Sequence, residues 1–487
     1  MQFLTAQFAN NDKTMNTKAL RQKILDLAIH GKLVPQDPND EPASVLLERI
    51  KAEKERLIKE GKIKRSKQSK TACDKQHYPF ELPEGWCWCK LGDLAFYKKG
   101  PFGSSLTKAM FVPESEDTYK VYEQKNAIQK DCTLGTYYIT KEKYDSLSGF
   151  AVHPFDIIVS CAGTIGEAYV LPRNIQKGII NQALMLIRLY SREIEQFYLL
   201  YFDFILKEEA KDSSKGTAIK NIPPFDILKN FFIPMPPLNE QRRILDEINR
   251  WMSFVDRIET STTKLKETIK QAKSKILDLA IHGKLVPQDP TDEPASELLK
   301  RINPKAEITC DNPQYRNLPK GWCLINGKSL FEPMKSTKPN GTFFKYIDID
   351  SIDNKRQRIN KIKELKSKEA PSRACRYTEK GDVVFSMVRP YLRNIAKVTD
   401  GDCIASTGFY ICRTSKLMLS DFCYYLMLSD YVVNGLNQFM KGDNSPSINK
   451  SNIEDWYYPL PPYKEQQRIV NAISKAFTTL DTISENL

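Results

Sequence analysis

Several features that would place this chain among enzymes, membrane proteins or secreted proteins are missing from its sequence. The 487 residues include only four histidines, and no apolar run approaches the length of a membrane-spanning helix. The eleven cysteines form no Cys-x-x-Cys pair, which excludes the common metal-binding spacing and favours reduced thiols. The start of the chain lacks the basic and apolar regions of a signal peptide. We therefore expect a cytoplasmic protein with no membrane association and no metal.

The loops by which enzymes hold cofactors are also missing. Residues 163–166, Gly-Thr-Ile-Gly, are too short for a phosphate-binding loop and lack the Lys and Ser or Thr that would follow it. Residues 221–225, Asn-Ile-Pro-Pro-Phe, match the Asn-Pro-Pro-aromatic loop of amino-methyltransferases only superficially, because an Ile is inserted. His30 and His282 stand at predicted helix ends, where a favourable dipole contact is expected. We expect no catalytic residue and no cofactor in this chain.

The charge balance points to a different class of partner. The chain has 73 Lys and Arg against 60 Asp and Glu, a net charge of +13 with a pI near 9.0. A basic chain of this size often binds nucleic acid, although charge alone is weak evidence. Hydrophobic residues make up 41% of the chain and charged residues 27%, which is typical of globular proteins with sizeable cores.

Neither glycine nor proline occurs in residues 239–282. Apolar or small residues recur there at alternating spacings of four and three, from Ile244 and Ile248 to Ile276 and Leu279. This heptad pattern predicts one helix, roughly 65 Å long at about 1.5 Å per residue. Such a helix needs a partner helix to cover its apolar seam. A long core helix is the alternative, but such helices rarely keep a strict 3.5-residue period for this length.

The partner for this helix is present in the same chain, in two pieces. Residues 275–290 recur without a change at 23–38, and residues 234–244 resemble 459–469. The C-terminal copy is offset from the central helix by 225 residues, and the N-terminal copy by 252 residues. With these offsets, residue 487 and residue 10 both correspond to position 262 of the central helix. The C-terminal piece therefore stops where the N-terminal piece begins. Joined, the pieces would form a second copy of the central helix. The chain is thus a two-fold repeat in circularly permuted order, with an expected break in symmetry at Asn303-Pro304.

Two globular segments lie between the helices. Both open with Leu-Pro-x-Gly-Trp, both contain an acidic turn that leads into a β-rich run, at 154–160 and 380–386, and both close on Pro-x-Pro-Pro. Elsewhere they differ greatly, which suits two readers of two different things. We predict an α+β fold: two mixed, mostly β domains separated by long antiparallel coiled-coil helices, in a pseudo-two-fold circular repeat. The predicted boundaries are 1–77, 78–235, 236–314, 315–460 and 461–487.

These doubled motifs resemble the specificity subunit of type I DNA restriction–modification systems, from about residue 15 to the end. The resemblance rests on Pro-x-Pro-Pro-x-x-Glu-Gln, Leu-Pro-x-Gly-Trp and Lys-Ile-Leu-Asp-Leu-Ala-Ile-His-Gly-Lys-Leu-Val, each present twice. It implies two target-recognition domains, 78–235 and 315–460, that each read half of a bipartite site in double-stranded DNA. It also implies helices that bind two methyltransferase subunits, to which restriction and translocase subunits are added. S-adenosylmethionine, ATP and Mg would belong to those partners, and this chain would catalyse nothing.

Basic and polar loops are the candidates for DNA contact, because amides and hydroxyls suit phosphate while Arg suits guanine and Asn suits adenine. For each residue taken singly, a solvated loop charge explains the sequence equally well. The candidates in the first domain are Lys98, Lys99, Ser104, Ser105, Lys215, Thr217 and Lys220. Those in the second are Arg389, Tyr391, Arg393, Lys441, Asn444 and Ser445. The seam residues predicted to bind a partner are Leu20, Ile24, Leu27, Ile244, Ile248, Ile276, Leu279 and Ile469.

Rival functions remain open from the sequence alone. A self-contained modification enzyme would need the missing cofactor and catalytic loops. A coiled-coil scaffold that binds only protein would not need two dissimilar β-rich segments on a basic chain. An orphan specificity subunit without DNA-modifying partners would have the same sequence features as a functional one.

Overall fold

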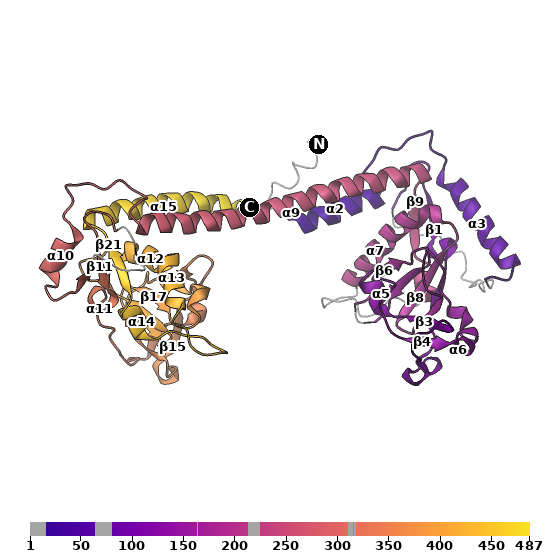
Figure 1. The fold of residues 1–487 in the computed structure, drawn as a ribbon. Helices are drawn as coiled ribbons and strands as arrows, with labels where there is room; N and C mark the ends of the chain where they lie inside the picture. The colour runs from indigo at the N-terminus through magenta and orange to yellow at the C-terminus, as the bar shows by residue number, and fades with distance from the viewer. Residues whose placement is uncertain (1–15, 64–79, 163, 213–224, 310–314, 316–317) are drawn as a thin grey trace. The chain divides into compact units, whose positions relative to one another are not determined.

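The computed structural model describes residues 16–63, 80–162, 164–212, 225–309, 315 and 318–487 (Figure 1). It divides into two compact units, which we call the N-terminal unit (Asn16–Glu259) and the C-terminal unit (Thr260–Leu487). Each unit combines helices with small sheets. The prediction of a mixed helix and sheet fold is therefore confirmed.

The N-terminal unit contains a four-stranded sheet of order β2-β8-β5-β6 and a three-stranded sheet of order β4-β3-β7. Strands β3 and β7 are parallel, and the other neighbours in these sheets are antiparallel. Its strands are β1 (Cys87–Lys90), β2 (Ala95–Lys99), β3 (Thr118–Tyr122), β4 (Tyr138–Thr140), β5 (Ile157–Ser160), β6 (Ala168–Val170), β7 (Gly178–Ile180), β8 (Leu184–Leu189) and β9 (Phe232–Met235). Its α-helices are α2 (Thr17–Ile29), α3 (Ala43–Lys59), α4 (Leu91–Leu94), α5 (Gln124–Ile128), α6 (Lys141–Ser146), α7 (Glu195–Asp212) and α8 (Phe225–Leu228).

The C-terminal unit has a four-stranded sheet, β15-β12-β19-β16, and two three-stranded sheets, β18-β17-β20 and β10-β11-β21. Its strands are β10 (Ile308–Thr309), β11 (Cys323–Asn326), β12 (Phe343–Ile347), β13 (Ile352–Asp353), β14 (Arg358–Ile359), β15 (Lys363–Lys366), β16 (Ala374–Thr378), β17 (Val383–Ser386), β18 (Ile395–Lys397), β19 (Cys403–Ser406), β20 (Phe409–Cys412) and β21 (Tyr457–Leu460). Its α-helices are α10 (Ala295–Ile302), α11 (Gly327–Leu330), α12 (Ser420–Leu428), α13 (Asp430–Asn437), α14 (Lys450–Glu454) and α15 (Tyr463–Glu485).

The long helix predicted at 239–282 is present as α9, Leu238–Ile281. Within the N-terminal unit, Arg21 of α2 donates to Asp256 at 2.5 Å, and Gln36 after α2 donates to Glu240 at 3.0 Å. The earlier residue, Arg21, contacts the later position on α9, and the later residue, Gln36, contacts the earlier one. Helices α2 and α9 therefore run in opposite directions (Figure 1). The seam is stable there because Ile244 and Ile24 lie in one hydrophobic core.

The last part of α9 has its own neighbour within the C-terminal unit. Lys273 of α9 forms an ion pair with Asp481 of α15, and Arg468 of α15 pairs with Asp292 at 2.6 Å. Helix α15 therefore runs opposite to α9, and Ile469 shares a core with α9 residue Ile281.

The two copies of the helix that follows the repeated segment differ in length, as the sequence predicted. Helix α3 covers Ala43–Lys59, whereas α10 ends at Ile302, with Asn303 as its C-cap. Proline 304 explains the difference, because a residue before proline disfavours the helical conformation.

Candidate nucleic-acid interface

The doubled sequence motifs meet at one joint in the N-terminal unit, which we define by Trp86, Glu240, Gln36, Gly31 and Pro83. The Trp86 indole Nε1 donates to Glu240 at 2.9 Å, and the Gln36 amide donates to the other carboxylate oxygen at 3.0 Å. Burial raises the pKa of Glu240. Gly31 has a φ of +64°, and a Cβ there would lie 2.4 Å from the Pro83 ring. Each motif thus supplies a part of one packed contact.

The same joint is built in the C-terminal unit from Trp322, Glu465, Gly283 and Pro319. Trp322 donates to Glu465 at 3.0 Å, and burial raises the pKa of Glu465. A Cβ on Gly283, whose φ is +62°, would lie 2.5 Å from the Pro319 ring. The motifs that carry the family resemblance are therefore structural, and the candidate functional surface must be sought in the loops that this frame holds.

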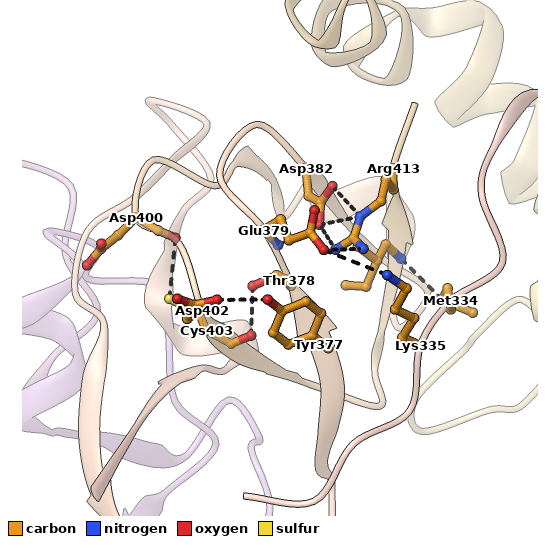
Figure 2. A network of polar contacts seen from close by, with 11 residues as sticks. Met334, Lys335, Tyr377, Thr378, Glu379, Asp382, Asp400, Asp402, Cys403 and Arg413 are labelled. Atoms are coloured by element: carbon orange, nitrogen blue, oxygen red, sulfur yellow. Dashed lines mark hydrogen bonds and ion pairs between the residues drawn. The ribbon is translucent and has the colours of Figure 1, made fainter. Parts of the chain in front are cut away.

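A second matched feature lies at the start of the central strand of each unit. In the C-terminal unit Arg413 pairs with Asp382 at 2.7 Å and with Glu379 at 2.8 Å, and Asp382 is only 5% exposed (Figure 2). In the N-terminal unit Arg188 pairs with Asp156 at 2.6 Å. Both acids precede the strands predicted from the acidic turns, which the structure contains as β5 and β17.

The turns that carry these acids also match. The amide of Asp156 bonds to the carbonyl of His153, and that of Asp382 to the carbonyl of Glu379, each at 3.1 Å. The third turn residue has positive φ in both, +69° at Phe155 and +98° at Gly381. Type II turns require such a residue. The two units therefore start their central strands from one turn design.

Two predicted DNA-contact loops come together in the C-terminal unit. The first, 389–393, lies between β17 and β18, and the second, 441–447, folds back on it. The Arg389 guanidinium donates to the Asn444 carbonyl at 2.7 Å, and the Arg389 amide bonds to the Pro446 carbonyl at 2.8 Å. Arg389, Tyr391, Lys441, Asn444 and Ser445 are all exposed. This cluster offers two cations, an aromatic ring and an amide on one surface.

Arg393 has different surroundings from the other candidates. Its guanidinium donates to the Leu428 carbonyl and to the Asp430 carboxylate. Its side chain is 29% exposed. The sequence could not reveal this, because the partners lie 35 and 37 residues away.

The first-domain candidates occupy the end of β2 and the loop after it. Lys98 lies over the Phe150 ring at 4.7 Å, Lys99 and Ser104 are exposed, and Ser105 is partly exposed. Phe102 at the tip of this loop is 86% exposed. The candidates Lys215, Thr217 and Lys220 lie outside the described residues. Which of these side chains contacts DNA stays a prediction.

Sequence reasoning missed one neighbour of that loop. The Asn181–Gln182 turn touches the loop, since a Cβ on Gly100 would lie 1.8 Å from the Asn181 carbonyl oxygen. Nothing in the sequence indicates this contact, because the two segments lie about 80 residues apart along the chain.

The eight seam residues predicted to bind a partner differ in burial. Ile24, Ile244, Ile248 and Ile469 are between 0% and 5% exposed. They pack within the chain's own cores, and their contact with a separate subunit stays a prediction. Leu20, Leu27, Ile276 and Leu279 are partly exposed, and their contact with a partner stays a prediction.

Helices typical of membrane proteins and side-chain clusters typical of metalloproteins are absent from the described residues. Among the described helices, none is both long and apolar enough to cross a membrane. Within the same part of the chain, no group of three or more His, Cys, Asp or Glu side chains is arranged to hold a metal ion.

Comparisons with known proteins agree with one another. The family described as "Type I restriction modification DNA specificity domain" matches residues 83–271 and 323–487. The type I restriction enzyme EcoAI specificity subunit of Escherichia coli is 27% identical, over 96% of this chain and 90% of its own length. The EcoEI specificity subunit of Escherichia coli is 26% identical over the same shares. A solved structure described as "Structural basis underlying complex assembly and conformational transition of the type I R-M system" has a TM-score of 0.52 and 18% identity, covering 83% of this chain and 93% of that one.

Proposed function

The chain belongs to the family of type I restriction modification DNA specificity domains, and from this premise we propose that it is the DNA-recognition subunit of a type I restriction–modification system. In this role it selects the DNA sequence and is not itself an enzyme, because methyl transfer and cleavage belong to other subunits. The observation that supports this most directly is that both units contain the same contacts around loops of different sequence. These contacts are the tryptophan–glutamate joint and the acid–arginine pair at the start of the central strand.

The two recognition domains define the kind of DNA site that the chain selects. Residues 78–235 and 315–460 act as target-recognition domains, and because their loops differ, they read two different halves of an asymmetric, bipartite site in double-stranded DNA. Residues 1–77, 236–314 and 461–487 form the spacer, a pseudo-two-fold antiparallel coiled coil. The opposite directions of α2 and α15 to α9 support this arrangement.

The partner subunits carry out the reactions that this chain does not catalyse. Two methyltransferase subunits bind the helices, and restriction and translocase subunits join the resulting complex in the cytoplasm. S-adenosylmethionine, ATP and Mg are bound by those subunits. Among the seam residues predicted to bind a partner, the partly exposed Leu20, Leu27, Ile276 and Leu279 are the more accessible ones.

Mapping of methylated bases in the host genome, with and without this gene, tests the function. We expect one split motif to disappear when the gene is deleted. Replacement of residues 78–234 by another reader should change one half of that motif and leave the other intact. A genome whose methylation does not respond to the deletion would instead favour an orphan subunit or a coiled-coil scaffold, and a swap that alters both halves would contradict the assignment of one reader per half-site.

A further inference from the structure

The loop 389–393 is held in an unusual backbone conformation. Arg389 and Arg393 both lie in the left-handed region, with φ of 48° and 53°. Side-chain-bearing residues rarely adopt it, and they keep it only where the surroundings hold them. Between them, Tyr391 is 47% exposed and Leu392 is 40% exposed. The loop thus presents two large side chains to solvent from a strained base.

The Arg393 side chain is one of the groups that hold this base. One η nitrogen donates to the Leu428 carbonyl and the other to the Asp430 carboxylate. The second oxygen of Asp430 accepts from the Ser274 hydroxyl on α9. Arg393 therefore connects the loop, through one carboxylate, to the long helix of the same unit.

A break between two helices creates the acceptor that Arg393 uses. Helix α12 ends at Leu428, and the Ser429 side chain caps α13 by accepting from the Val432 amide. In an unbroken helix that amide would bond to the Leu428 carbonyl. The break leaves the carbonyl for Arg393. The corresponding helix of the N-terminal unit, α7, runs from Glu195 to Asp212 without such a break.

We propose that Arg393 is a positioning residue for the second reader and does not itself contact DNA. This inference rests on the proposed function, and it reassigns a residue that the sequence placed among the DNA contacts. The Arg393 charge is paired with Asp430 and each of its η nitrogens donates to the protein's own groups, so this guanidinium is committed to the fold. Its role is to keep Tyr391 and Leu392 in the one conformation that meets the bases, while the exposed cations Arg389 and Lys441 supply the attraction for DNA.

The test compares Arg393→Ala and Arg393→Lys with Lys441→Ala in the full chain. One readout is the methylated motif in the host, and the other is binding of the chain to a duplex carrying that motif, or single-base variants of it, across a series of salt concentrations. For Arg393→Ala we expect a loss of about tenfold in preference at the second half-site, since a misplaced loop forfeits its base contacts. The first half-site and the salt slope should not change, and Arg393→Lys should recover part of the preference. Lys441→Ala should make the slope of log affinity against log salt concentration shallower by about 0.9, the value for one phosphate contact.

The opposite pattern would overturn the inference. If Arg393→Ala lowers the salt slope by about 0.9 and keeps every base preference, Arg393 is a phosphate contact. Asp430→Asn guards against a folding defect, because it is nearly isosteric and removes no cation. It removes the charge that Arg393 faces but keeps an oxygen that can accept, so it should cause a smaller loss of the same kind at the second half-site, and a loss at the first half-site would contradict the proposal. A wild-type chain without any motif would overturn the proposed function as well, whereas a motif that these variants leave intact would overturn the positioning role alone.

Discussion

At the residue scale, the repeated motifs are explained by single contacts that occur in both units. Glycine is needed before each Lys-Leu-Val segment for two reasons that can be separated. The first is its positive φ, and the second is the proline ring that lies where a Cβ would stand.

Gly31→Ala should show the cost of the left-handed backbone and the cost of the clash with the proline ring together. The left-handed conformation alone costs about 1 kcal/mol for alanine, and the methyl group would also meet the Pro83 ring at 2.4 Å. Gly61→Ala is the matched control, because Gly61 has a φ of +69° with nothing within 4 Å of the added Cβ. We expect Gly31→Ala to lower the free energy of unfolding by roughly 2–4 kcal/mol and Gly61→Ala by about 1 kcal/mol, measured by denaturant unfolding. Equal losses would show that the joint yields to the methyl group.

The buried carboxylates of the joints predict a pH dependence. Because burial raises the pKa of Glu240 above 4.5, the folded protein binds a proton more tightly than the unfolded chain does. This contribution favours the fold below pH 4.5 and is lost as the pH rises through the folded pKa. In Glu240→Gln the contribution is absent, so its stability relative to wild type should improve between pH 4.5 and 7. Urea midpoints across that range check the trend, and Glu465→Gln should show the same trend; a constant difference from wild type would contradict the assignment.

At the element scale, the central strand of each unit begins at a buried ion pair. In Arg413→Ala the carboxylate of Asp382 stays buried without its partner, which typically costs 3–5 kcal/mol. Lys335→Ala is the control, because Lys335 is 64% exposed and forms a long surface ion pair, 3.9 Å from the Glu379 carboxylate. The effect of this substitution on stability should be small. Thermal unfolding of both variants measures the difference. If Arg413→Ala unfolds at the temperature of Lys335→Ala, the pair does not hold the strand start.

The elements also show where sequence reasoning succeeds and where it stops. The bounds of α9 came from periodicity and from the absence of glycine and proline, both of which are local properties. The end of α10 came from one proline. The loops differ, because a loop conformation depends on partners far along the chain. Arg393 illustrates this, since its two acceptors become available only through a helix break that no periodicity reveals.

At the scale of the whole molecule, α9 is one unbroken helix whose halves belong to different units. Insertion of four residues near Thr262 lengthens it by roughly 6 Å, about two base-pair steps, and adds little more than one turn. If α9 sets the spacing of the readers, methylation mapping of the insertion variant should show a longer unread gap between unchanged half-sites. An insertion that changes the bases read and keeps the gap would contradict a spacer role for this helix.

The sequence by itself determined the helical framework, the permuted repeat and the family, because these are written in residue spacing and in motifs that recur. It also placed the candidate loops of the second reader, although it could not show that 389–393 and 441–447 touch. Only the tertiary structure decided which seam residues are buried in the chain's own cores and which stay accessible, because burial depends on what packs against each face. It also separated Arg393 from Arg389, two residues of the same type four positions apart. Their surroundings differ because Asp430 and the Leu428 carbonyl meet one guanidinium in the folded chain, and the other remains exposed.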